Sequence, residues 1–232
     1  MYGIRKMTQE EVDEMCKKHE AWLKNRADGA RADFHNAYLR GVNFRGKNLE
    51  QANFESADLS SAFMQDVNLS RANLKGASLT FARAANAKFD DCKADFACFE
   101  EARLIGASFN GASLQSASFN DAIINFVSFA EADLRRASFI DAVTGGTKFA
   151  TAQIDHAAFN SGIAGDFFDD KQIAEFAYHL CNAVLQGSTN SPQVKDEVRK
   201  ILSLANRAES VKVFGRVQEY RNGQYVTAKK AE

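Results

Sequence analysis

Residues 52–61 of this chain read ANFESADLSS, two five-residue units that each place an alanine two positions before a bulky apolar residue. The same spacing continues without an insertion from Phe34 to Phe159, which makes 26 consecutive units. Neither the 3.6-residue period of a helix nor the two-residue period of a strand puts every fifth residue on one inner surface. The chain must therefore turn by a fixed angle in each unit and stack on itself as a solenoid.

The units resemble the A(D/N)LXX signature of the pentapeptide-repeat family. The resemblance is carried by units such as Ala52-Asn53-Phe54-Glu55-Ser56, Ala57-Asp58-Leu59-Ser60-Ser61 and Ala132-Asp133-Leu134-Arg135-Arg136. It implies a mainly β fold, a right-handed quadrilateral β-helix with four units in each coil and with both the bulky residue and the alanine inside. Such a column would contain about six and a half coils and be about 31 Å long, since neighbouring coils are roughly 4.8 Å apart.

Residues twenty apart should then lie directly above one another, which defines four walls by their inner residues. The first wall is built on Phe34 to Ile154, the second on Leu39 to Phe159, the third on Phe44 to Thr144 and the fourth on Leu49 to Phe149, each at intervals of twenty. Most of the 19 phenylalanines fall in the second and fourth ladders or at other inner positions. We interpret them as stacked core aromatics and not as a ligand site.

Composition indicates a charge-balanced soluble protein. The chain has 30 acidic and 29 basic residues and a net charge of −1, which argues against direct binding to nucleic acid or to an anionic membrane. It has no apolar run of transmembrane length, and its first residues lack the apolar core of a signal peptide. Four scattered cysteines fit a reducing compartment. We therefore expect a cytoplasmic protein.

Four segments are expected. Residues 1–29 should form an N-terminal capping helix with a capping box at Thr8 and Glu11, and residues 30–163 should form the repeat β-helix. Residues 164–210 should form a C-terminal α-helical hairpin. Residues 211–232 are expected to be a tail with a short hairpin around Asn222-Gly223. The sequence from Lys18 to Leu23 that leads into Arg31 to Phe34 is similar to the opening of many bacterial and prophage-encoded members of the family.

The C-terminal helical pair predicts self-association. Two amphipathic helices carry more apolar surface than the end of a narrow column needs, so we expect a homodimer with Phe176, Leu180, Val198 and Ile201 at or beside its two-fold axis. The alternative is that the two helices are a simple cap.

No catalytic constellation, cofactor site or metal site is predicted. The best metal-like pairs, Cys16 with His19 and His179 with Cys181, belong to opposite ends of the column and cannot easily supply four ligands together. Cys92 occupies an alanine position and should be buried, whereas Cys98 should face outward. The protein is expected to be non-catalytic.

Two outward surfaces are candidates for function. The acidic candidates, on or at the edge of the second wall, are Asp58, Glu100, Glu101, Asp121 and Asp141. The apolar and basic candidates, on or at the edge of the third wall, are Phe63, Arg83, Arg103, Ile105, Ile123, Phe126 and Val143, with Arg45 on the same wall. The apolar members could form a docking site, or some could fold inward where Ala84 or Thr144 underfills the core.

Two functions compete. The first is a scaffold that binds a protein partner through a wall of the column. The second, implied by resemblance to mycobacterial and quinolone-resistance members, is a DNA mimic that occupies the DNA-binding saddle of a type II topoisomerase, gyrase. Mimicry needs a dense acidic stripe, but residues 28–160 hold sixteen acidic and thirteen basic residues, a net charge of only −3. The scaffold is therefore preferred.

Overall fold

The computed structural model of the chain describes residues 5–149, 151–159, 219–221 and 224–226. It has two compact units, Met1–Ile163 and Ala164–Glu232. In the second, β5 (Glu219–Arg221) pairs antiparallel with β6 (Gln224–Val226), on either side of the predicted turn at Asn222-Gly223. The predicted C-terminal helices and their dimer contacts at Phe176, Leu180, Val198 and Ile201 lie outside the described residues.

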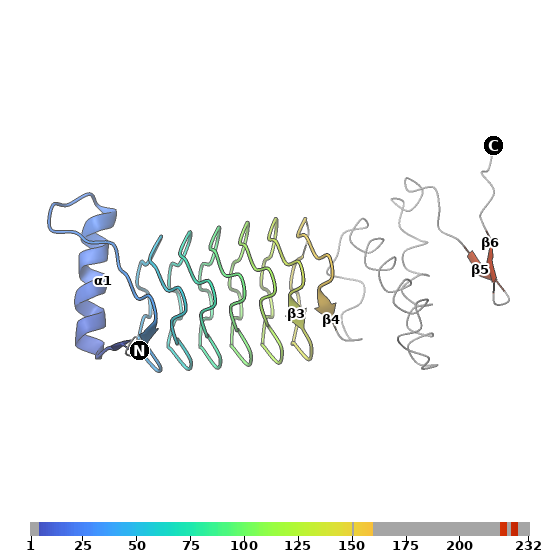
Figure 1. The fold of residues 1–232 in the computed structure, drawn as a ribbon, viewed down its shortest axis with the longest axis horizontal. Coiled ribbons are helices and arrows are strands. Elements are labelled where there is room, and N and C mark those ends of the chain that lie inside the picture. The colour runs from blue at the N-terminus through green and yellow to red at the C-terminus, as the bar shows by residue number, and fades with distance from the viewer. Residues whose placement is uncertain (1–4, 150, 160–218, 222–223, 227–232) are drawn as a thin grey trace. The chain divides into compact units, whose positions relative to one another are not determined.

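The first unit is a stack of coils joined by parallel bridges between residues one coil apart (Figure 1). Asp33 bridges Asn53 and Asn53 bridges Asn73, and the same twenty-residue step recurs at every fifth residue. Each coil therefore has four bridged positions, which confirms the predicted register and the β-helical fold. Regular strands are short, β2 (Ala37–Tyr38), β3 (Ser138–Phe139) and β4 (Ala158–Phe159), because a turn follows each inner bulky residue.

The corners of the coils hold the second residue after each bulky residue in the left-handed conformation. This applies to residues as different as Glu101 (φ 55°), Phe126 (φ 59°) and Arg136 (φ 62°). The conformation is unfavourable for residues with a Cβ, but the corner N–H of Glu101 donates to the carbonyl of Asn120 in the next coil at 3.1 Å. Stacking of coils thus stabilises the corners, and a corner side chain of any kind points outward.

In the C-terminal half of the column, the core contains aromatic rings in two ladders that meet edge to face. Phe109 lies parallel to Phe89 (ring centroids 4.5 Å apart) and to Phe129 (5.2 Å) within the fourth wall, and edge-on to Phe99 and Phe119 of the second wall (5.4 and 5.7 Å). All five side chains are fully buried. Both arrangements suit the ring quadrupole. The predicted phenylalanine ladders are confirmed.

The N-terminus adds one strand to the first coil, which the sequence pattern did not reveal. The strand β1 (Arg5–Lys6) pairs parallel with β2, placing Arg5 opposite Ala37 and Lys6 opposite Tyr38. The next residue, Met7, is 8% exposed. This strand occupies the open edge of the second wall, where a free row of backbone donors and acceptors would otherwise face solvent.

The helix α1 (Gln9–Leu23) follows and lies across the first coil (Figure 1). The predicted capping box is confirmed, because Thr8 Oγ1 accepts from the Glu11 N–H and Glu11 Oε2 accepts from the Thr8 N–H. Gly29 returns the chain beneath the helix, and a Cβ there would lie 2.2 Å from the Trp22 backbone nitrogen. The close approach of these two segments requires glycine at position 29.

Side chains of α1 bond to backbone groups at the edge of the first coil. The amide of Gln9 donates to the Asn43 carbonyl (3.1 Å) and accepts from the Asn43 N–H (2.9 Å), as a neighbouring strand would. Buried His19 accepts from the Ala32 N–H at Nδ1 (3.0 Å), so its Nε2 carries the proton and donates to the Glu50 carbonyl (2.9 Å). The groups of Asn43 and the carbonyl of Glu50 occupy positions whose equivalents elsewhere, such as Phe63 and Ser70, bond to the preceding coil, so α1 satisfies edge groups of the first coil.

An ion pair also joins α1 to the first coil. Lys47 stands at a position where most units have alanine, and its Nζ lies 3.1 Å from Asp13 Oδ1 on the helix. This hydrogen bond to Asp13 raises the pKa of Lys47. A lysine is tolerated at this inner position because the first coil has α1, and not another coil, beneath it.

The buried His19 predicts that acid destabilises the fold. Burial lowers the pKa of His19 below 6.5, and the charge of Arg31 lowers it further. The hydrogen bond to the Glu50 carbonyl and the charges of Glu20 and Glu50 raise the pKa but do not outweigh burial. As pH falls, the imidazole of His19 therefore takes up a proton in the unfolded chain before it does so in the folded one. The stability that neutral His19 gives the fold is complete above about pH 6.5 and is lost as pH falls below that value. The fall in urea midpoint between pH 7.5 and 5.5 should be smaller in His19→Gln than in the wild type. Equal falls in the two proteins would contradict the assignment.

Candidate functional site

One column of outward side chains runs along the third wall. Parallel bridges link Phe63 to Arg83, Arg83 to Arg103, Arg103 to Ile123 and Ile123 to Val143, so these five residues occupy one position in five successive coils. The column is aromatic and basic toward the N-terminus and aliphatic toward the C-terminus.

The basic part of the column is organised around an aromatic ring. The guanidinium carbons of Arg45 and Arg83 lie 4.8 and 5.1 Å from the ring centroid of Phe63, within the range of cation–π attraction. Arg45 also donates to the side-chain oxygen of Gln65 at 2.8 Å. Neither Arg83 nor Arg103 has an ion pair within the described part of the chain, and both are exposed. The wall therefore presents two uncompensated positive charges in adjacent coils.

The apolar part of the third wall is exposed. Val143 is 51% exposed, and Phe126, at the corner between the third and fourth walls, is 71% exposed. Ile105 and Ile123 are half-buried. Phe126 lies over Gly146 of the next coil, where a Cβ would be 2.7 Å from the ring. The small inner residues Ala84 and Thr144 are buried in their own positions, whereas the apolar candidates are half-buried or exposed, so none of them turns inward.

Two exposed apolar residues beside this wall were not among the sequence candidates. Phe81, 49% exposed, stands at the corner between the second and third walls, and Ile140, 44% exposed, lies one residue before that corner. Of the five large apolar side chains exposed among the described residues, only Phe96 lies away from the third wall and its two corners, at the corner between the first and second walls. The repeat register could have identified Phe81, because it occupies the same corner as Glu101.

The acidic candidates divide into two groups. Glu101, Asp121 and Asp141 occupy the corner between the second and third walls in three successive coils, with φ of 55°, 58° and 58°. Glu100 accepts from the Ser118 hydroxyl (2.9 Å), and Asp58, two coils nearer the N-terminus, accepts from the Ser60 N–H (3.0 Å). The structure thus gathers three of the five carboxylates into a short row and places Asp58 in a turn.

Catalytic and metal chemistry finds little support in the described residues. They contain no group of three or more histidine, cysteine or acidic side chains suited to a metal ion. Burial raises the pKa of Cys16 to about 12 and also raises that of Cys92, so neither buried thiol is poised as a nucleophile. Cys98 is half-exposed, as predicted, and contacts the Thr80 hydroxyl at 3.3 Å.

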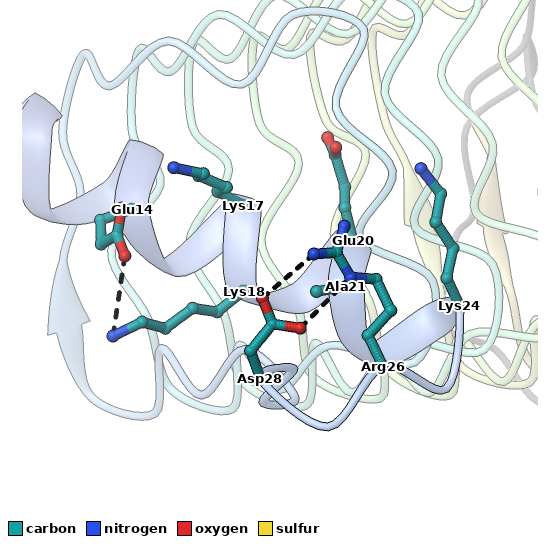
Figure 2. Close-up of a pocket in the computed structure, with 8 residues that line it drawn as sticks. All are labelled: Glu14, Lys17, Lys18, Glu20, Ala21, Lys24, Arg26 and Asp28. Carbon is teal, nitrogen blue, oxygen red and sulfur yellow. Dashed lines mark hydrogen bonds and ion pairs between the residues drawn. The ribbon is translucent and has the colours of Figure 1, made fainter.

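A hollow on the outer side of α1 is also unlike a ligand site. Figure 2 shows its lining of seven charged side chains and Ala21. Two of the charge pairs satisfy each other, Glu14 with Lys18 (3.7 Å) and Arg26 with Asp28 (3.2 Å). Binding pockets usually combine an apolar lining with a few convergent polar groups, which this surface does not offer.

Comparisons with known proteins concern the coiled column. Residues 25–136 match the model of pentapeptide repeats in eight copies, over 25–46, 32–71, 68–104 and 97–136. No curated protein sequence matches the chain. In the described part of the structure, no helix has the length and apolar character that a membrane crossing requires.

Solved structures of the same kind match at low identity. The pentapeptide repeat protein Rfr23 from the cyanobacterium Cyanothece 51142 shares 15% identity over 64% of this chain and 99% of its own (TM-score 0.37). QnrB1, a plasmid-mediated fluoroquinolone resistance protein, shares 14% over 55% of this chain and 81% of its own (TM-score 0.32). HetL of Nostoc sp. strain PCC 7120, involved in regulating heterocyst differentiation, shares 19% over 56% and 79% (TM-score 0.31). The repeat sequence and its twenty-residue register identify this chain as a member of the pentapeptide-repeat family.

Proposed function

We propose that this protein is a non-catalytic scaffold that binds a protein partner through the third wall. The observation that carries the proposal is the grouping of exposed apolar side chains on one side of the column. Val143 lies on the third wall, Phe81 and Phe126 stand at its two corners, and Ile140 lies beside it. Neighbouring exposed apolar side chains on a protein surface often mark an interaction site. Arginine and phenylalanine are both enriched at protein interfaces.

The coiled column supplies the rigidity that such a site needs. Arg83, for example, sits between the buried residues Ala82 and Ala84, and its backbone N–H and carbonyl bond to Ala62 and Met64 of the preceding coil. A partner can therefore bind without ordering a loop, which lowers the entropic cost of association.

Replacing apolar side chains of the third wall with charged ones should abolish binding of the partner. We expect Phe126→Asp with Val143→Asp to lose specific proteins that copurify with the tagged full chain from its own cells, because two carboxylates would be desolvated in the interface. The matched control is Phe96→Asp with Ser116→Asp, which adds the same charges at one corner between the first and second walls. Quantitative mass spectrometry of the copurified proteins measures the effect. Retention of every partner by the first variant, or equal loss from both, would contradict the proposal.

A DNA mimic of gyrase is the second candidate, favoured by the row of Glu101, Asp121 and Asp141. Three corner carboxylates make a short stripe, and Arg103 lies two residues from Glu101 on the adjacent wall. Reversing the charges of Glu100, Glu101, Asp121 and Asp141 together should abolish inhibition of DNA supercoiling if this candidate is right. Purified protein that leaves gyrase activity unchanged at micromolar concentration would reject it.

Dimerisation and location are further parts of the proposal. A homodimer through Phe176, Leu180, Val198 and Ile201 stays a prediction from their amphipathic spacing, as does a cytoplasmic location. Sedimentation of the full chain across a concentration series tests the dimer, which a persistent monomer would reject.

A further inference from the structure

We infer that the occupant of the third wall is an amphipathic helix of the partner, lying along the column axis with carboxylates over Arg83 and Arg103 and apolar side chains over Ile123, Phe126 and Val143. The inference rests on the proposed function and adds to it the chemistry and the secondary structure of the bound segment.

The arginines define one end of this site. Arg83 is held against Phe63 at 5.1 Å from the ring centroid, and the bridge between Arg83 and Arg103 places the two residues in adjacent coils. Both guanidiniums are exposed and have no carboxylate partner within the described residues. A guanidinium presents paired N–H donors that match a carboxylate, so these positions favour glutamate or aspartate in the ligand.

The aliphatic residues define the other end. Ile123 and Val143 continue the same column over the next two coils, and the ring of Phe126 stands at the adjacent corner, 71% exposed. Burial of these side chains by apolar groups would contribute roughly 25 cal/mol for each Å² of apolar surface removed from water. The charge pattern and the apolar pattern are therefore sequential along the axis and not side by side.

The spacing of the coils selects a helix over a strand as the bound segment. From Arg83 to Val143 there are three coil steps, about 14 Å at the spacing of bridged chains. Three turns of an α-helix cover about 16 Å, so the pattern i, i+4, i+7 and i+11 stays in register within about 2 Å. In a strand, every second residue faces the wall, and three such steps span about 20 Å, which leaves a mismatch of about 6 Å. A helix aligned with the axis meets all four column residues.

The surroundings of the arginines disfavour nucleic acid as the ligand. Glu101, Asp121 and Asp141 line the corner between the second and third walls and would repel a phosphate backbone. The outward side chains of Ile123, Val143 and Phe126 would also meet charged phosphates instead of apolar groups. A narrow helix can contact the column of Arg83 to Val143 without covering the acidic corner.

A designed peptide tests the inference while the cellular partner is still unidentified. The probe is an alanine-rich 18-residue helix with glutamate at positions 4 and 8 and leucine at positions 11 and 15. One control peptide has lysine at positions 4 and 8, and a second has the two glutamates moved to the opposite helix face, with helicity matched by circular dichroism. The full chain is titrated by fluorescence anisotropy as wild type, as Arg83→Glu with Arg103→Glu, and as Lys88→Glu with Lys93→Glu, which makes the same charge change on other walls.

We expect the wild type to bind the glutamate probe at least tenfold more tightly than either control peptide. The affinity of Arg83→Glu with Arg103→Glu for the glutamate probe should be at least tenfold lower than that of the wild type, and its affinity for the lysine peptide should be higher. Lys88→Glu with Lys93→Glu should bind the peptides as the wild type does. Equal binding of all three peptides, or equal losses in both variants, would overturn the inference. A 20-base-pair DNA duplex that binds more tightly than the probe and requires Arg83 and Arg103 would overturn it in favour of nucleic acid.

The two proposals can fail separately. If Phe126→Asp with Val143→Asp removes a cellular partner but no peptide binds, the helix inference is wrong and the scaffold function stands. If that variant retains every partner and no peptide binds, both are wrong.

Discussion

Replacing Phe109 with alanine should destabilise the protein by about 3–5 kcal/mol, the largest effect expected of a single substitution in the column. The ring contacts four other phenylalanines, two stacked and two edge-on, and none of them is accessible to solvent. The coils above and below are fixed by backbone hydrogen bonds, so the core cannot collapse into the space that the ring leaves. Chemical denaturation followed by far-UV circular dichroism measures the loss.

The control for Phe109→Ala is a substitution on the outside of the same wall. Lys88→Ala removes an exposed side chain next to the fully buried Phe89 and should change the stability by less than about 0.5 kcal/mol. Ser113, although it faces outward, is a poorer control because its hydroxyl donates to Asp95 at 2.6 Å. Equal stability of Phe109→Ala and Lys88→Ala would contradict the register.

Replacing His19 with leucine should cost about 2–4 kcal/mol, because one buried and one half-buried hydrogen-bonding group lose their partner and each unsatisfied group costs about 1–3 kcal/mol. The groups are the Ala32 N–H and the Glu50 carbonyl of the first coil, bonded to the imidazole at 3.0 and 2.9 Å. The same unfolding measurement tests whether α1 acts as a cap that stabilises the column.

His19→Gln is the matched variant, since a glutamine side chain also has an acceptor and a donor. It should retain more stability than His19→Leu if the two hydrogen bonds matter, and the two variants should be alike if the imidazole acts only by filling space. A leucine variant as stable as the wild type would show that α1 does not stabilise the first coil through His19.

The column could be predicted well from the sequence because each inner position repeats the same physical requirement. Most five-residue units have a bulky inner residue and a small one two places earlier, so Phe109, Cys92 and the outward Cys98 could all be placed by counting. The same counting predicts one outward column on the third wall, and the parallel bridges confirm it for Phe63, Arg83, Arg103, Ile123 and Val143.

The ends of the column and the environment of each side chain could not be counted in this way. The pairing of β1 with β2 and the amide bonds of Gln9 occur once, so no period in the sequence reports them. Counting placed Glu100 and Glu101 outward but did not show that Ser118 donates to Glu100, because that contact depends on the side-chain rotamer. Exposure of Phe126 similarly depends on the small residue Gly146 in the next coil.

Site-specific photo-crosslinking tests most directly whether the third wall is the binding surface. Phe126 and Phe96 are a natural pair, because both are corner phenylalanines with φ of 59° and 60° and exposures of 71% and 63%, but they belong to different corners. Benzoylphenylalanine is placed at either position in the full chain, and the crosslinked products formed in cells are compared. A discrete partner captured from position 126 and absent at position 96 is the predicted result. Capture of the same proteins from both positions, or only from position 96, would contradict the account.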